Sequence, residues 1–331
     1  MMKRKHGRIY QIYHVNAFEW LAKRNEASIH AVVTDPPYGI VEYTPEQLSK
    51  RRNGNGGIWR LPQNYDGHKR SPMPRFTVLT PADHLRIREF HKRLAPLLYK
   101  VLVPGGHVVL SSQNLLSHLV IDEFVSAGFE MRGQVARIVK TLRGGDRPKG
   151  AHKKYANISV SPRSCWEPWL IFRKPCQGLV RENLFRWGTG ALRRESEHKP
   201  FSDLIQSSPA RGQERRLASH PSLKPQAFIR QIVHAVLPLR TGIILDPFMG
   251  SGSTIAAAAA CGLCSIGLEV NPLYFKLANR SIPALAQYTP SKVNGNEARP
   301  KRRHEIVGYH TNNFPLTKRT KVKSAILHFP L

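Results

Sequence analysis

Apolar positions along the chain form short runs that alternate with stretches of helical periodicity. Residues 8–35 predict a strand, a helix and a second strand that ends at Thr34 and Asp35, while residues 82–100 and 224–239 carry apolar side chains at helical spacing. Further predicted elements are strand PGGHVVLSS, helix LLSHLVIDEFVSAG, strand FEMRGQVARIVK, strand GIILD, helix STIAAAAAC, strand CSIGLE and helix PLYFKLANRSI. This alternation predicts an α/β fold with a doubly wound, mostly parallel sheet.

Three polar regions interrupt the pattern. Residues 41–80 are rich in Gly, Asn, Pro and basic residues, and residues 175–218 lack long apolar periodic runs. From about residue 287 onward the chain is basic and weakly patterned. Long loops in compact domains are usually functional or disordered. The loop at 50–70 could therefore close over a bound nucleic acid or stay solvated, and the tail could be a DNA-binding arm or a disordered segment.

The net charge of the chain indicates the kind of partner that it binds. Its 331 residues hold 51 Lys and Arg against 22 Asp and Glu, a net charge of +29. Such an imbalance indicates a polyanionic partner, with nucleic acid favoured. An anionic membrane is the rival, but no apolar run approaches the ~18 residues of a spanning helix. The basic N-terminus is not followed by a continuous apolar stretch, so we expect no secretory signal.

Four cysteines occur, and Cys261 and Cys264 form a C-x-x-C pair. No second pair lies at a spacing typical of zinc sites, so the sequence predicts plain buried thiols and no metal. Unpaired cysteines favour a reducing compartment, and we expect a cytoplasmic protein.

A glycine-containing loop follows strand GIILD in the sequence LDPFMGSGST. Gly250 and Gly252 allow a tight turn and close backbone approach to a ligand. We expect Ser253 or Thr254 to cap the next helix, whose first amide groups favour a carboxylate or phosphate. No Gly-Lys-Ser/Thr follows, which disfavours a Walker-type phosphate loop.

The next strand ends in an acid, Glu269. At this distance from a glycine loop, a carboxylate can accept hydrogen bonds from the ribose hydroxyls of an adenosine. The loop and the acid fit NAD and S-adenosylmethionine equally well, and a structural turn with a solvated glutamate is the alternative.

Residues Asp35 to Tyr38 read Asp-Pro-Pro-Tyr and follow a buried strand. The Asp35 carboxylate and the peptide oxygen of Pro36 could each accept one hydrogen of the exocyclic amino group of a flipped adenine or cytosine. Two prolines restrict φ and keep the turn rigid. Tyr38 offers a face for base stacking, worth ~1–3 kcal/mol per base. An ordinary proline turn with a buried tyrosine is the alternative. This clamp for a planar amine favours S-adenosylmethionine over NAD.

Three blocks of the sequence resemble amino-methylating DNA methyltransferases of the permuted, beta class: TDPPYGI, HPSLKPQAF, and LDPFMGSGST with GLEVNPLYFKLANRSI. The resemblance covers residue 8 to about 285 in general layout. It implies a Rossmann-like, circularly permuted sheet with an inserted target-recognition region, and S-adenosylmethionine as cofactor. In that family Asp in the clamp usually accompanies methylation of adenine N6 and Ser that of cytosine N4, so Asp35 implies adenine.

The resemblance also implies the site residues. The catalytic clamp is Asp35, Pro36, Pro37 and Tyr38. The implied cofactor contacts lie in or beside the second and third blocks: Asp246, Pro247, Phe248, Gly250, Ser251, Gly252, Ser253, Thr254, Glu269, Asn271 and Lys224. In the family, the His-Pro-x-x-Lys-Pro block, here with His220 and Lys224, opens the helix before the cofactor strand and helps to close the cofactor site.

The same layout divides the chain into four segments. We expect a catalytic half at 1–140, a basic target-recognition region at 141–218, a cofactor-binding half at 219–286 and a basic tail at 287–331. The candidate DNA contacts are basic side chains of the recognition region: Arg143, Arg147, Lys149, Lys153, Lys154, Arg193, Arg194 and Arg211. Trp166, Trp169 and Phe172 could form a wall of the base pocket or pack within a strand.

Taken together, the sequence predicts an S-adenosylmethionine-dependent enzyme that methylates a flipped base in double-stranded DNA. A monomer and a homodimer remain open. The alternatives are a cytosine N4 enzyme, an RNA methyltransferase, and an inactive nucleic-acid-binding module on the same fold. A dehydrogenase is disfavoured because it would need neither the proline clamp nor a charge of +29.

Overall fold

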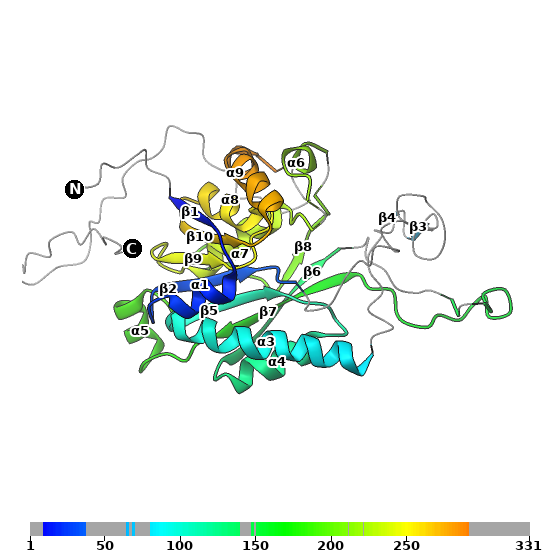
Figure 1. Ribbon diagram of the computed structural model, residues 1–331, viewed down its shortest axis with the longest axis horizontal. Coiled ribbons are helices and arrows are strands. Elements are labelled where there is room, and N and C mark those ends of the chain that lie inside the picture. The colour runs from blue at the N-terminus through cyan, green and yellow to red at the C-terminus, as the bar shows by residue number, and fades with distance from the viewer. Residues whose placement is uncertain are drawn as a thin grey trace, which may run out of the picture. The chain divides into compact units, whose positions relative to one another are not determined.

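The computed structural model describes residues 9–37, 80–139, 147–148, 150–210, 212–220 and 222–290, together with two short strands at 64–65 and 68–69. Its centre is an eight-stranded sheet with the order β1-β10-β9-β2-β5-β7-β6-β8 (Figure 1). The short strands β3 (Asn64–Tyr65) and β4 (His68–Lys69) pair with each other in a separate antiparallel ribbon.

Five neighbouring strands of the large sheet are parallel: β1 (Tyr10–His14), β10 (Cys264–Glu269), β9 (Ile243–Asp246), β2 (Ile29–Thr34) and β5 (Leu102–Ser111). The sheet continues with β7 (Trp166–Arg173), which is antiparallel to β5 and to β6 (Glu130–Ile138). The edge strand β8 (Leu204–Gln206) runs parallel to β6. The predicted α/β fold with a mostly parallel sheet is therefore confirmed.

Helices cover both faces of the sheet (Figure 1). One face carries α1 (Ala17–Lys23), α3 (Pro81–Val101) and α4 (Ser117–Ser126). The other carries α7 (Gln226–Val236), α8 (Ser253–Ala260) and α9 (Pro272–Gln287). Two short helices, α5 (Val180–Trp187) and α6 (Gly212–Leu217), lie in the region where the sequence shows no long apolar run.

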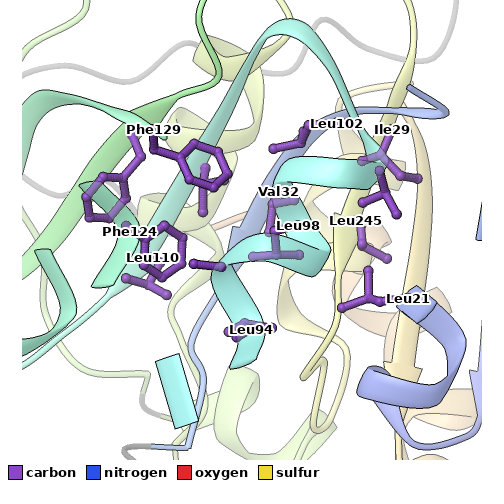
Figure 2. Packing of buried hydrophobic residues seen from close by; sticks show 14 of the residues in the cluster. Leu21, Ile29, Val32, Leu94, Leu98, Leu102, Leu110, Phe124, Phe129 and Leu245 are labelled. Atoms are coloured by element: carbon purple, nitrogen blue, oxygen red, sulfur yellow. The ribbon is translucent and has the colours of Figure 1, made fainter. Parts of the chain in front are cut away.

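The alternation of side chains along β2 explains the two layers. Val32 belongs to the apolar cluster under α1, α3 and α4, whereas Ala31 and Val33 belong to the cluster under α7 and α8. Successive residues of a strand point to opposite faces, so this central strand carries apolar side chains toward both layers. Figure 2 shows the first cluster, in which Leu98 of α3 lies close to Val32.

The aromatic part of the first cluster gives a test of its contribution to stability. Phe124 is fully buried, with its ring 4.5 Å from that of Phe172 and stacked on it. Phe124→Ala is expected to lower the free energy of unfolding by ~3–5 kcal/mol, because it leaves a cavity in a packed core. Phe185→Ala is the matched control, since Phe185 is 95% exposed and its removal should change stability by under ~0.5 kcal/mol.

Urea denaturation of the wild type and both variants measures this difference. Equal losses in the two variants would contradict the assignment of Phe124 to the core.

Candidate active site

The segments that follow β2 and β9 begin side by side at one edge of the sheet. The two strands are parallel neighbours with Val32 opposite Leu245, so their carboxyl ends meet at the same edge. Thr34 Oγ1 donates a hydrogen bond of 2.8 Å to Asp246 Oδ1 in a buried position. The two motifs that were noted far apart in the sequence are thus held together by backbone pairing and by this side-chain bond.

Asp35 stands directly beyond this edge, with 19% of its side chain exposed. Its Oδ2 accepts hydrogen bonds from Ser222 Oγ at 2.7 Å and from Lys224 Nζ at 2.6 Å. Of the other predicted clamp residues, Pro36 is buried and Pro37 is exposed. Tyr38 lies outside the described residues. The carboxylate is therefore anchored through one oxygen by the segment that leads into α7.

That segment, residues 220–225, also touches the glycine loop. A Cβ atom on Gly250 would lie 3.1 Å from His220 Nε2, so the loop and the imidazole are in close contact. The His220 ring packs edge-on against Tyr274, with 4.4 Å between ring centroids. Burial lowers the pKa of His220 to about 4, so the imidazole is neutral near pH 7. The segment thus joins the surroundings of Asp35 to those of the loop.

The glycine loop adopts the conformations that its glycines permit. Gly250 has φ +53° and Gly252 has φ +83°, in the left-handed region. A side chain on Gly252 would overlap Ile282 of α9, so this position needs glycine for helix packing as well as for the turn. The expectation that Ser253 or Thr254 caps α8 is wrong. Gly252 is the N-cap without a side-chain bond, and Thr254 instead bonds to Asp246.

Glu269 lies against the loop from the end of β10. Its Oε2 accepts the backbone N–H of Gly250 at 3.0 Å and its Oε1 accepts that of Asn271 at 2.7 Å. Each carboxylate oxygen can accept more than one hydrogen bond, so the group keeps acceptor capacity. The Asn271 side chain caps α9 by accepting from the amides of Leu273 and Tyr274. Glu269 therefore fixes the loop while remaining half-exposed.

Asp246 has a different environment. It is buried, and burial raises its pKa to about 6 although Thr254, Thr34 and the amide of Phe248 donate hydrogen bonds to it. The neighbouring Pro247 is buried. Phe248 packs against Phe90, with 5.7 Å between ring centroids. The remaining loop residues Ser251, Ser253 and Thr254 are also buried.

Glu167 and Arg137 also belong to the site, although the sequence analysis did not name them. Lys224 Nζ lies 3.1 Å from Glu167 Oε1, and Glu167 Oε2 pairs with Arg137 Nη1 at 2.6 Å. Burial by itself raises the pKa of Glu167, but the charges of Lys224 and Arg137 outweigh it and lower the pKa to about 2. The signal in the sequence was a single acid within the aromatic run SCWEPWLIF and a single arginine within QVARIV.

The residues predicted to contact DNA differ in their exposure and in their hydrogen-bond partners. Arg147, Lys153 and Lys154 are exposed. Arg193 donates to the carbonyl of Pro238 at 2.7 Å, and Arg194 donates to the carbonyls of Ser196 and Glu197. Arg143, Lys149 and Arg211 lie outside the described residues.

Pro238 follows the last turn of α7, whereas Lys224 precedes the first turn. The helix spans about 16 Å between them. The structure therefore does not bring Arg193 to the Asp35 edge of the sheet.

The aromatic residues of β7 pack within the sheet. Trp169 and Phe172 are fully buried, and the Trp169 ring lies edge-on to Phe228 at 5.1 Å between centroids. Trp166 is half-buried at the start of the strand. The packing interpretation of this stretch is confirmed for Trp169 and Phe172.

All four cysteines are free thiols, as the sequence predicts, but the expectation of burial is wrong: Cys261 is half-buried and Cys264, at the start of β10, is exposed. Within the described part of the chain, no helix is long and apolar enough to span a bilayer. The same residues contain no cluster of three or more His, Cys, Asp and Glu side chains arranged to hold a metal ion.

Comparisons with known proteins find relatives in sequence. The Type II methyltransferase M.HindIII of Haemophilus influenzae is 24% identical over 294 residues, which cover 81% of this chain and 93% of that protein. The DNA adenine methyltransferase YhdJ of Escherichia coli is 37% identical over 76 residues, which cover 23% of this chain and 25% of that protein.

Solved structures share the fold. The M1.HpyAVI–SAM complex has a TM-score of 0.51 at 20% identity and covers 82% of this chain and 98% of that one. The cytosine-N4-specific PvuII DNA methyltransferase has a TM-score of 0.53 at 14% identity, covering 86% of this chain and 88% of that one.

The family model N6_N4_Mtase, described as DNA methylase, matches residues 29–280. This match spans more than half of the chain and includes the Asp35 clamp, the Lys224 segment, the glycine loop and Glu269. The chain therefore belongs to the N6_N4_Mtase family of DNA methylases, as its three sequence blocks predicted.

Proposed function

We propose that this protein transfers a methyl group from S-adenosylmethionine to the exocyclic N6 amine of an adenine that is flipped out of double-stranded DNA. The observation that carries the proposal is the geometry of Asp35. Ser222 and Lys224 bind its Oδ2 from one side, at the same sheet edge as the glycine loop. A fixed carboxylate can then direct Oδ1 toward an amine.

The residues around the loop have the chemistry that S-adenosylmethionine requires. Gly250 and Gly252 allow the left-handed turn of the loop, and the first amides of α8 favour the carboxylate of an amino acid. Glu269 has acceptor capacity for ribose hydroxyls. When bound, the cofactor supplies an electrophilic methyl group on a sulfonium centre. The residues Asp246 to Thr254, with Glu269, Asn271 and Lys224, are the proposed surroundings of this group.

The clamp would orient the amine rather than act by a covalent step. Asp35 Oδ1 accepts one amine hydrogen and the Pro36 carbonyl accepts the other, which localises the nitrogen lone pair and aims it at the methyl group. Tyr38 stacks on the base. Holding two reactants in a reactive geometry can contribute ~7–11 kcal/mol, so positioning supplies much of the proposed catalysis.

Adenine is the proposed base because an aspartate, rather than a serine, begins the clamp. The named adenine specificity of the Escherichia coli relative is consistent with this choice. Cytosine N4 is the alternative. Digestion of methylated DNA to nucleosides and identification of the modified nucleoside distinguishes the two.

DNA binding is proposed to rest on the net charge of +29 and on the basic residues of the 141–218 segment. Arg147, Lys153 and Lys154 are the better placed of the described candidates, because all three are exposed and donate no hydrogen bond to the backbone of the residues that the structure describes. Arg193 is a weaker candidate, because its guanidinium donates to the Pro238 carbonyl. A monomer and a homodimer are both compatible with this proposal, as is a cytoplasmic location.

Substitution of Asp35 tests the clamp. Asp35→Ala should lower the single-turnover rate of methyl transfer by at least ~10²-fold, because the amine loses its acceptor. Cofactor affinity should be largely retained, since Lys224 keeps Glu167 as a partner. Transfer of a radiolabelled methyl group to DNA measures the rate. Asp122→Ala, which removes an exposed partner of Arg88, is the control and should leave the rate unchanged. Loss of folding in Asp35→Ala alone would instead indicate a structural aspartate.

Substitution of Glu269 tests the cofactor site. Glu269→Ala should weaken S-adenosylmethionine binding by about 10- to 100-fold, because hydrogen bonds to a charged group are lost. Affinity for DNA should be nearly unchanged. Titration calorimetry with the cofactor, and a DNA-binding assay on the same variant, measure both. An unaltered cofactor affinity would remove Glu269 from the site.

The raised pKa of Asp246 predicts a pH dependence of stability. The folded carboxyl takes up a proton near pH 6, whereas that of the unfolded chain does so near its usual value of 3.8. The folded state therefore binds more protons between these values, and stability rises as the pH falls from 7 to 4.

Relative to Asp246→Asn, the wild type should gain at most about 3 kcal/mol over this range. Urea denaturation of both proteins without cofactor at several pH values measures the gain. A stability difference that is constant from pH 7 to pH 4 would contradict the buried, proton-binding carboxyl.

A further inference from the structure

Two cross-strand ion pairs of the same kind join β6 to β7. Glu130 lies opposite Arg173 at one end of the ladder, with 2.6 Å between Oε2 and Nη2. Arg137 lies opposite Glu167 near the other end, also at 2.6 Å. The two pairs are about 20 Å apart along the strands. The two pairs differ in their surroundings. Glu167 is at the edge of the sheet where Asp35 lies, whereas Glu130 is at the opposite edge.

Glu167 belongs to a row of alternating charges that ends at the clamp. Arg137 pairs with Glu167, Glu167 pairs with Lys224, and Lys224 pairs with Asp35. The side chains of Arg137, Glu167 and Lys224 are 6%, 12% and 12% exposed. Ser111 Oγ donates a further bond of 2.8 Å to Glu167 Oε1, the oxygen that faces Lys224. The carboxylate of Glu167 is thus fixed from three directions.

Lys224 needs a partner of this kind to hold Asp35. Besides Asp35, its ammonium donates to Ser222 Oγ at 3.3 Å, a residue of the same segment. Because a lysine ammonium ends a flexible four-carbon stem, these two contacts alone would leave its position poorly defined. Burial of an ammonium is also costly unless opposite charges surround it. With Glu167 on one side and Asp35 on the other, the ammonium is confined between two carboxylates, and Oδ2 of Asp35 is confined with it.

We propose that Glu167 is a positioning residue for methyl transfer: acting through Lys224, it fixes the Asp35 carboxylate so that Oδ1 faces the amine of the target base. This inference rests on the proposed function. Glu167 itself touches neither the base nor the cofactor in this scheme. The competing explanation is that Glu167 only neutralises Arg137, in the same way that Glu130 neutralises Arg173.

The matched pairs permit a direct test. Glu167→Gln and Glu130→Gln each convert a cross-strand carboxylate to an amide. Glu167→Gln should lower the single-turnover rate of methyl transfer, at saturating cofactor and DNA, by at least about 10-fold, because a displacement of an ångström in a reacting group can cost ~10²-fold. Glu130→Gln should leave the rate within about 2-fold of the wild type, which is a change of only a few tenths of a kcal/mol in the activation free energy. Cofactor affinity should be equal in both variants.

A double substitution shows whether the effect passes through the lysine. Lys224→Met should also slow transfer, and Glu167→Gln should add nothing in the Lys224→Met background, because the intermediary is already gone. If Glu167→Gln does not fold, as urea denaturation would reveal, Ser111→Ala replaces it. That change removes a neutral donor to Glu167 Oε1 and should slow transfer in the wild-type background but not in the Lys224→Met background.

The outcomes separate this inference from the proposed function. Transfer by the wild type with an unimpaired Glu167→Gln variant would overturn the positioning role and leave the proposed function intact. Equal effects of Glu167→Gln and Glu130→Gln, or additive effects of Glu167→Gln and Lys224→Met, would likewise overturn it. No transfer to any DNA by the wild type would overturn the proposed function, and the inference with it.

Discussion

The parallel pairing of β2 with β9 is the constraint on which the rest of the site depends. It puts the residues after Thr34 and those after Leu245 at one edge of the sheet, although they are far apart in the chain. The buried bond from Thr34 to Asp246 continues this pairing beyond the last backbone contact. Because neighbouring parallel strands present their carboxyl ends together, a permuted order of the two halves gives the same site. The fold therefore tolerates an order in which the clamp precedes the glycine loop.

Burial of alternating charges is the second constraint. Asp35, Lys224, Glu167 and Arg137 lie in a row in which each charge faces one or two of opposite sign. Removing Glu167 would leave the buried Arg137 without its carboxylate, and the loss of one partner from a buried ion pair costs more than the pair contributes to stability. The row is thus better understood as a device that fixes geometry. It begins at Arg137 of β6 and Glu167 of β7, continues to Lys224 in the segment before α7, and ends at Asp35 of the proposed clamp.

The sequence predicted most elements with long apolar runs, because periodicity reports burial directly. The strand ending at Thr34 and the helix around Phe228 both appear where periodicity indicated them. The short helix α5 was not predicted. Four of its eight residues are apolar, but its buried residue is Asn183, which donates to the carbonyl of Pro104. A contact of this kind depends on a distant strand and leaves no periodic signal. The cap of α8 was predicted wrongly for a related reason, since Thr254 turns to Asp246 on the neighbouring strand end.

By itself, the sequence determined the fold class, the family and the residue types at the ends of the strands, because these follow from apolar patterning and from local motifs such as Asp-Pro-Pro-Tyr and the glycine loop. Which side chains meet depends on how the strands and helices pack, and local patterns in the sequence do not give this. Lys224 was predicted to lie by the cofactor, and in the fold it contacts Asp35 and Glu167. The physical reason is that an ion pair needs two charged atoms within a few ångströms, and that separation is fixed by strand order and by the start of α7, neither of which is a local property of the chain.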